Sequence, residues 1–267
     1  MATSAEIRRR SKRLELRTTP EERELIERAA EVSGSDLTEF VLTHASEAAR
    51  RILADRDRFH LSGDALVAWE AVNARRARDL PGLRELMSRP SPFAELTQAY
   101  TRPEPLRADH LLDEFECRSS EQPLWLRRYA RQSVAVGTTR VFVVTEGGSL
   151  GVVANYGWCM AQLNAPDAPP RLRKGGGRYP QPVVLLARLG VEVHHEGRGI
   201  GAGLLQDVFL RLLALSDDIG CRALLVHAES SAARDFYRHL VPEFEESPTD
   251  PLHLVLLTKD IRRTLTR

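Results

Sequence analysis

Two amphipathic helices are expected near the N-terminus. Apolar residues between positions 25 and 32 recur at helical spacing. Ahead of them, Thr19 and Glu22 form a capping box with Pro20 at the first helical position. Gly34 is a suitable C-terminal stop, and a second apolar stripe at helical spacing opens within two residues of it. The pattern therefore predicts a helix, a tight turn and a second helix.

A short alternating segment precedes the first helix. In Arg13–Arg17, a period of two places Leu14 and Leu16 on one face and Arg13, Glu15 and Arg17 on the other, which is typical of a strand. The segment has no hairpin partner nearby in the sequence, so we expect it to pair with a second copy of itself. A strand and two helices of about 45 residues bury too little surface to fold alone, which also predicts a dimer.

From about residue 105 onward the pattern changes to alternating strands and helices. Glu146–Ser149 is a hairpin signal between two β-rich runs, and later strands alternate with helices, as in a mixed α/β sheet. The expected strands are Arg140–Thr145, Leu150–Asn155, Val183–Val193, Cys221–His227 and Leu252–Leu257, and the expected helices are Ile200–Ser216 and Ser231–Leu240.

The intervening stretch Asp55–Pro92 is charged and only weakly periodic. It predicts one or two short helices that need a partner surface, and the four prolines of Ser88–Pro105 favour a domain boundary there. We therefore divide the chain into residues 1–54, 55–95 and 96–267. The candidate anchors of the middle segment are Trp69, Leu80, Leu83, Leu86 and Met87.

Composition indicates a globular protein, with 42% hydrophobic and 28% charged residues among 267. The formal net charge is +1, so any affinity for nucleic acid must come from local patches. The apolar runs fall short of the roughly 20 residues that span a bilayer. Cys117, Cys159 and Cys221 lie far apart without CxxC spacing, which argues against a disulfide framework or a metal site. We expect a cytoplasmic protein that binds neither metal nor membrane.

The most specific motif is Arg198-Gly199-Ile200-Gly201-Ala202-Gly203, between an expected strand and a long helix. Glycines let backbone amides approach a ligand, and the N-terminus of the helix adds partial positive charge, so the motif could cradle a pyrophosphate. No Lys-Ser/Thr pair follows, which argues against a P-loop, and no acidic residue follows a βαβ repeat, which argues against a dinucleotide fold. A plain turn at a helix start is the alternative.

With its preceding strand and with Phe236-Tyr237 after it, this motif resembles the signature of the GNAT acetyltransferases. The chain is further similar to the TacT-type GNAT toxins over roughly Pro105–Arg267, and Lys12–Leu53 resembles TacA-type ribbon-helix-helix antitoxins. The toxin resemblance rests on Phe115 with Cys117, Trp125-Leu126-Arg127-Arg128, Leu189-Gly190-Val191, Arg222-Ala223-Leu224-Leu225-Val226-His227-Ala228 and Phe236-Tyr237; the antitoxin resemblance rests on Arg13–Glu22 and Thr38-Glu39-Phe40-Val41-Leu42. The resemblance implies a fused antitoxin and toxin: a ribbon-helix-helix module followed by a GNAT fold.

The resemblance also implies acetyl-CoA as co-substrate and assigns its contacts. Tyr237 matches the catalytic tyrosine that protonates the departing thiolate, a general-acid role worth roughly 10²–10⁴ in rate. A core aromatic on an amphipathic helix is the alternative for Tyr237. The matched pyrophosphate loop consists of Arg198, Gly199, Gly201 and Gly203, and the strand facing the cofactor contributes Leu189, Val191 and Val193.

Family members acetylate the α-amine of aminoacyl-tRNA and thereby block translation. An α-amino group has a pKa of roughly 7.7–8.0, so a strong base is not required and none is assigned. His194 and His195 are expected to be solvated or to contact phosphate. Basic clusters that could neutralise tRNA phosphates, or simply form solvated faces, are Arg127, Arg128 and Arg131 on one expected helix and Arg173 with Lys174 in a loop.

In the ribbon-helix-helix interpretation, Arg13, Glu15 and Arg17 face the bases of operator DNA from a homodimer, and residues 55–95 neutralise the toxin in cis. Association beyond a dimer stays open. Two other functions remain as alternatives. One is a non-catalytic repressor that responds to acetyl-CoA, and the other is an acetyltransferase acting on a small amine or a protein lysine.

Overall fold

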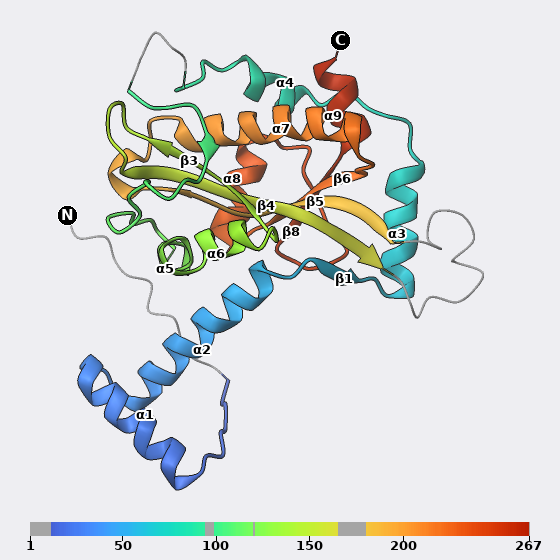
Figure 1. Cartoon of the computed structure of the whole chain (residues 1–267). Coiled ribbons are helices and arrows are strands. Elements are labelled where there is room, and N and C mark those ends of the chain that lie inside the picture. Colours follow the sequence, from blue (N-terminus) through green and yellow to red (C-terminus); the bar gives the residue numbers. More distant parts are fainter. Residues whose placement is uncertain (1–11, 94–98, 120, 165–179, 267) are drawn as a thin grey trace, which may run out of the picture. The chain divides into compact units, whose positions relative to one another are not determined.

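The computed structural model describes residues 12–93, 99–119, 121–164 and 180–266 (Figure 1). The chain divides into two compact units, Met1–Ala48 and Ala49–Arg267. The expected division at residues 54 and 95 differs from this split, and we retain it as a proposal about function.

The first unit contains the two expected helices, α1 (Pro20–Ser33) and the first part of α2 (Leu37–Ala54). The capping box is present: the Thr19 side chain accepts from the Glu22 amide, and the Glu22 carboxylate accepts from the Thr19 amide. Gly34 ends α1 in the left-handed conformation, at φ 69°. Residues 13–19 of this single chain lie in neither helix nor strand, so a strand that pairs with a second copy stays a prediction.

The second unit is built on one mixed sheet in the order β2-β3-β4-β5-β6-β8-β7, and β1 pairs with the far end of β4. The strands β4 and β5 pair antiparallel, β5 and β6 parallel, and β6 and β8 antiparallel. The strand bounds are β1 (Arg58–His60), β2 (Glu104–Pro105), β3 (Arg140–Thr145), β4 (Val152–Asn164), β5 (Gln181–Val191), β6 (Ala223–His227), β7 (Glu245–Glu246) and β8 (His253–Leu257).

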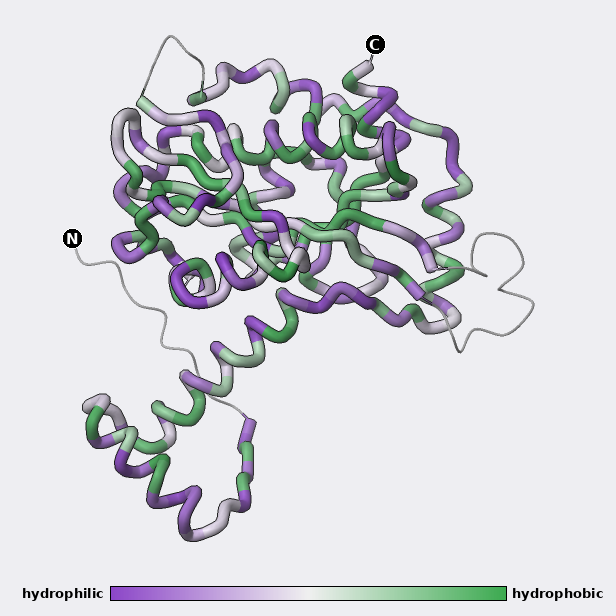
Figure 2. Tube along the Cα trace, viewed as in Figure 1, coloured by the Kyte–Doolittle hydropathy of each residue, from purple (hydrophilic) through white to green (hydrophobic). Residues whose placement is uncertain are grey.

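Helices cover both faces of this sheet. In Figure 1, α4, α7 and α9 lie along one face, and α5 and α6 lie on the other. Figure 2 shows that the central strands are mostly hydrophobic, as strands buried on both faces require. The helix bounds are α3 (Gly63–Ala74), α4 (Pro81–Ser88), α5 (Glu121–Arg128), α6 (Ala130–Ala135), α7 (Ile200–Asp218), α8 (Ser231–Leu240) and α9 (Thr258–Leu265).

Most expected elements after residue 139 are confirmed. Three details of the whole prediction are wrong, two of them in this part of the chain. The expected strand Val183–Val193 ends at Val191, because Val193–His195 forms a 3-10 turn. The expected strand Leu150–Asn155 is longer and runs to Asn164. Arg127, Arg128 and Arg131 were expected on a single helix, but the helix is interrupted at Tyr129. Arg127 and Arg128 therefore lie on α5 and Arg131 on α6.

The segment between the two expected domains belongs to the core of the second unit. Trp69 of α3 packs with β4, β5 and β6, while Leu80 and the α4 residues Leu83 and Leu86 pack in the cluster that includes α7. These four side chains are buried, and Met87 is partly buried against the same core. The weak periodicity of this segment therefore hid apolar residues that pack in two separate clusters of the core.

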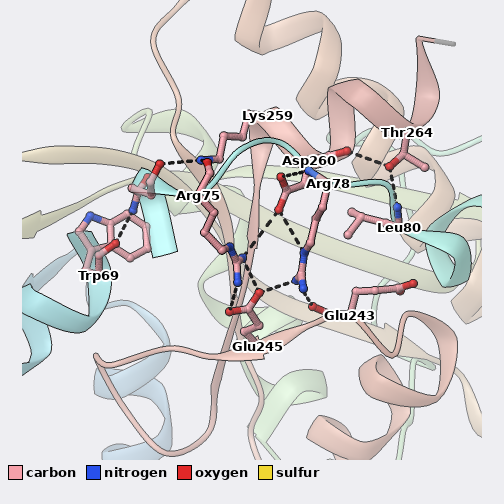
Figure 3. Close-up of polar contacts among 10 residues, drawn as sticks. Trp69, Arg75, Arg78, Leu80, Glu243, Glu245, Lys259, Asp260 and Thr264 are labelled. Carbon is pink, nitrogen blue, oxygen red and sulfur yellow. Dashed lines mark hydrogen bonds and ion pairs between the residues drawn. The ribbon is translucent and has the colours of Figure 1, made fainter. Parts of the chain in front are cut away.

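Charged side chains hold the connection between α3 and α4 against the C-terminal part of the sheet (Figure 3). Arg75 forms a hydrogen-bonded ion pair with Glu245 at 2.6 Å, and Arg78 pairs with the same carboxylate. Buried Asp260 accepts from the Arg78 amide at 2.9 Å. A carboxylate buried in this way must be paired, so the cluster fixes the segment to β7 and α9.

Candidate active site

A cleft begins where two central strands separate. The ladder between β5 and β6 covers only Val184–Leu186, whereas β5 continues to Val191 along β4. The β4–β5 register shifts opposite Gly157 and Trp158, and this irregularity coincides with the separation. The edge of β5 from Ala187 to Val191 is thus free of β6 and can offer backbone hydrogen bonds to a ligand. The predicted residues Leu189 and Val191 lie on this edge, whereas Val193 lies beyond it.

The glycine motif forms the turn into α7 at the end of this cleft. Gly197 and Gly199 have φ values of 74° and 77°, which side-chain-bearing residues rarely adopt. Gly199 caps α7, so the first amides of this 19-residue helix lack intrahelical acceptors and can bind an anion. The Gly203 amide is the exception, because it already donates to the Gly199 carbonyl at 2.9 Å. The turn fits a diphosphate presented to its first amides.

The two later glycines of the motif permit close packing. A Cβ at Gly201 would lie 3.0 Å from the Phe236 ring, and one at Gly203 would lie 2.8 Å from Pro92 and Phe93. The Arg198 guanidinium donates to the hydroxyl of Tyr100 at 2.9 Å, and that hydroxyl lies 2.9 Å from Nδ1 of His195. These contacts tie the loop to the neighbouring segment and give His195 a partner.

Tyr237 faces a pocket beside the open edge of β5. It lies on α8, which begins after the Ser230 cap, and the residue is 4% exposed. Ala187, Leu189 and His227 line the same pocket. Burial raises the pKa of Tyr237 above its ordinary value, so the hydroxyl stays protonated at neutral pH. A protonated phenol in this position can donate a proton to a leaving group.

A buried cation borders this pocket. The Arg188 side chain is 2% exposed, and its Cζ lies 4.1 Å from the centroid of the Trp125 ring. Its Nη1 donates to Asp55 at 2.8 Å, and its Nη2 lies 3.4 Å from Glu121. Burial raises the pKa of Glu121, while the nearby guanidinium opposes that shift. Arg188 was not predicted, although it is the only charged residue within Val183–Val191.

The pocket also contains residues from the end of α2. Arg50 and Ala54 line it, and Arg50 Nε lies 3.9 Å from the Glu229 carboxylate. His227 and Glu229 were likewise not assigned from the sequence. His227 is the last residue of β6 and Glu229 follows two residues later, and this position directly after an apolar run is the signal that could have identified them.

Of the three predicted tRNA-binding arginines that the structure describes, two are bonded to other residues of the chain. Arg127 donates to the Phe115 carbonyl at 2.9 Å and pairs with Glu116, and Arg131 donates to the His110 carbonyl at 2.6 Å. Arg128 is exposed. Arg173 and Lys174 lie outside the described residues.

The predicted DNA-reading residues are exposed. Arg13 and Glu15 form an ion pair at 3.1 Å, with side chains 86% and 75% exposed, and Arg17 is also exposed. Charged side chains on an extended segment are available to a polar partner.

Two kinds of feature are absent from the described part of the chain. No group of three or more potential ligands is placed to hold a metal ion among those residues. The helices described there are all too short or too polar to cross a bilayer.

Comparisons with known proteins match an N-terminal part of the chain to antitoxins and another part to a toxin. The sequence model of the family described as "Antitoxin TacA 1-like" matches residues 13–91. The tRNA-acetylating toxin of Mycobacterium tuberculosis (strain ATCC 25618 / H37Rv) is 44% identical over 138 residues, which are 52% of this chain and 80% of that protein. Antitoxin TacA of the same strain is 43% identical over 93 residues, which are 35% of this chain and 58% of that protein.

Solved structures support the fold. AtaT complexed with acetyl-methionyl-tRNAfMet superimposes with a TM-score of 0.53 at 23% identity, over 61% of this chain and 98% of that one. AtaTR bound with acetyl-CoA gives 0.50 at 24% identity, over 62% and 97%. The separated strands, the glycine turn and the tyrosine pocket define an acetyltransferase of the GNAT class. Within that class, the chain belongs to the family of the tRNA-acetylating toxins, and a TacA-like antitoxin region precedes its acetyltransferase region.

Proposed function

We propose that this chain transfers the acetyl group of acetyl-CoA to the α-amine of aminoacyl-tRNA, and that its own antitoxin-like region restrains the reaction. The observation that carries the proposal is the position of Tyr237 in a pocket beside the edge of β5 that β6 leaves open. The similarity to a tRNA-acetylating toxin supports the choice of tRNA as acceptor.

The chain has a part for each portion of acetyl-CoA. The first amides of α7 after Gly199 would hold the diphosphate, and the backbone of Leu189 and Val191 would hold the pantetheine arm. Attack of the neutral amine on the thioester carbon then forms a tetrahedral intermediate. As the carbon–sulfur bond breaks, Tyr237 would donate its proton to the sulfur, which avoids release of a bare thiolate.

The end of α2 would restrain this reaction by occupying the acceptor side of the pocket. Arg50 and Ala54 line the pocket, and Asp55 pairs with Arg188. The next segment contributes Trp69 and Leu83 to the core, so the restraining residues cannot diffuse away. Covalent linkage raises their effective concentration to the millimolar range.

The N-terminal unit would bind operator DNA as a homodimer. Exposed Arg13, Glu15 and Arg17 would face the bases from a two-stranded ribbon formed with a second copy. Their position directly ahead of the capped helix α1 supports this arrangement.

The proposal is tested by mass spectrometry of total tRNA from cells that express the full chain carrying Arg50→Ala and Asp55→Ala. We expect N-acetylated aminoacyl-tRNA, and we expect its loss when Tyr237→Phe is added. Acetylated polyamines or lysine peptides with unmodified tRNA would instead assign the enzyme another amine substrate.

One observation favours a second candidate function. Because Arg50 and Ala54 already line the pocket, the chain could be a repressor that binds acetyl-CoA without turnover. Repression of its own promoter that responds to acetyl-CoA and survives Tyr237→Phe, with no acetylated tRNA in the double variant, would support this function.

A further inference from the structure

Two imidazoles, half-buried His227 and buried His253, extend from the wall of the pocket into the sheet. His227 ends β6, His253 begins β8, and the two are direct partners in the antiparallel ladder. Nδ1 of His227 lies 2.9 Å from Nε2 of His253, which is 1% exposed. Nδ1 of His253 lies 2.7 Å from the Thr249 hydroxyl, which in turn lies 2.8 Å from that of Ser247. The hydrogen-bonded chain thus leads from the pocket to the half-buried loop at Thr249.

The open end of this chain lies at the pocket that contains Tyr237. His227 lines that pocket, and its Nδ1 is taken by His253. Nε2 of His227 makes no hydrogen bond to any residue that the structure describes, so it is the ring nitrogen available to a bound substrate. In one neutral arrangement His253 donates to Thr249 and His227 donates to His253, and Nε2 of His227 then carries a free lone pair.

The charges around His227 come from several elements. Asp250, between β7 and β8, and Glu229, between β6 and α8, favour the protonated ring, whereas Arg188 on β5 and Arg56 ahead of β1 oppose it. Burial lowers the pKa of His227 and also that of His253, and a charge on His227 lowers the pKa of His253 further. The pair is therefore neutral at pH 7 and can accept a proton.

We propose that His227 accepts the proton that the substrate amine loses during acetyl transfer, and that His253 and Thr249 lead this proton away from the pocket. The inference rests on the proposed function and adds a catalytic base to it. His253 and Thr249 would act only through His227, as positioning residues.

The bonds and protons of the step balance. The amine nitrogen forms a bond to the thioester carbon, and the carbonyl electron pair moves to oxygen. Nε2 of His227 takes one proton from the nitrogen, which attack has made strongly acidic. The electron pair on oxygen then re-forms the carbonyl bond, and the carbon–sulfur bond breaks with its electrons on sulfur. Tyr237 protonates the sulfur. One N–H is lost and one S–H is gained, and Tyr237 recovers its proton from solvent.

The test uses the full chain, with and without Arg50→Ala and Asp55→Ala, and single-turnover acetyl transfer from acetyl-CoA to total charged tRNA between pH 6 and 9.5. His227→Asn keeps an amide near the Nδ1 position and removes Nε2, and His239→Asn, on the exposed surface of α8, is the matched control. We expect His227→Asn to slow the reaction about 100-fold at pH 7.5 and His239→Asn to leave it unchanged.

The pH profile separates a base from a structural histidine. The rate of the parent chain should level off above pH 8, once the amine is neutral. The His227→Asn rate should keep rising about tenfold per pH unit as hydroxide replaces the base. Thr249→Val, which keeps both imidazoles, should lower the rate several-fold without this change of profile.

The outcomes are distinguishable. A parent chain that acetylates tRNA and a His227→Asn variant within threefold of it, with the same profile, would overturn the role of His227 alone. Absence of acetylated tRNA from both parent chains would remove the proposed function, and with it this step. We expect His227→Asn to bind acetyl-CoA with unchanged affinity in calorimetry, which shows that the variant is folded. A loss of affinity as large as the loss of rate would contradict a purely chemical role of His227.

Discussion

Oδ1 of Asp55 accepts a hydrogen bond from Nη1 of Arg188 at 2.8 Å, although the two residues lie 133 positions apart in the sequence. Asp55 follows the last residue of α2, and Arg188 lies on the part of β5 that β6 leaves free. The contact therefore joins the antitoxin-like region to the wall of the pocket that contains Tyr237.

We expect Asp55→Ala to increase acetyl transfer about two- to fivefold. The Asp55 side chain is 47% exposed, and an ion pair of that exposure contributes roughly 0.5–1 kcal/mol, so its loss loosens the restraint only partly. Asp57→Ala, two residues further on and also exposed, is the matched control. Equal rates of acetylation for both variants and the wild type, measured with charged tRNA, would exclude Asp55 from the restraint.

We expect Arg188→Met to destabilise the second unit by about 3 kcal/mol, because it leaves the buried Glu121 carboxylate without its cationic partner. Adding Glu121→Gln should recover most of this loss. The free energy of unfolding from urea titration measures both changes. If Arg188→Met is as stable as the wild type, the Arg188–Glu121 pair does not contribute to the free energy of unfolding.

The sequence predicted the elements around the site better than the site itself. The capping box at Thr19 and Glu22, the turn at Gly34 and the helix Ser231–Leu240 depend on neighbouring residues, and all are confirmed. By contrast, the bulge near Ala187 and the gap between β5 and β6 depend on pairing between distant strands, which local periodicity does not report.

The middle segment illustrates the same limit. Trp69 is buried by strands, and Leu80 packs in the cluster that contains α7, more than 80 residues later in the chain. Their own neighbourhood therefore shows only a charged, irregular pattern. A truncation that removes residues 1–95 would take these side chains out of the core. Restraint of the active site is therefore better tested by point substitutions near the pocket.

Gly199→Ala should weaken acetyl-CoA binding by about tenfold. A residue with a Cβ at φ 77° costs roughly 1–2 kcal/mol, and relief of that strain would turn the first amides of α7 away from the diphosphate. Gly137→Ala is the matched control, since Gly137 has the same φ and lies in the turn after α6. Isothermal titration calorimetry measures the affinity of both variants for acetyl-CoA. An equal loss of affinity in both would show that the effect is a general destabilisation of the fold and not a change in the turn before α7.

Arg13→Ala and Arg17→Ala should each weaken binding to a promoter fragment of the chain's own gene and lower the slope of log affinity against log salt by up to about one. Both side chains are exposed on the segment expected to form the ribbon. Arg23→Ala, on the surface of α1 and paired with Glu27, serves as the control. Binding that is indifferent to both substitutions at Arg13 and Arg17 would refute the ribbon arrangement.

In the proposed function, the Tyr237 pocket performs acetyl transfer to charged tRNA. The most direct measurement incubates the purified full chain carrying Arg50→Ala and Asp55→Ala with radiolabelled acetyl-CoA and either charged or deacylated tRNA. We expect label on charged tRNA only, with a loss of at least 100-fold on adding Tyr237→Phe. Label on deacylated tRNA, or undiminished transfer by the Tyr237→Phe chain, would contradict it.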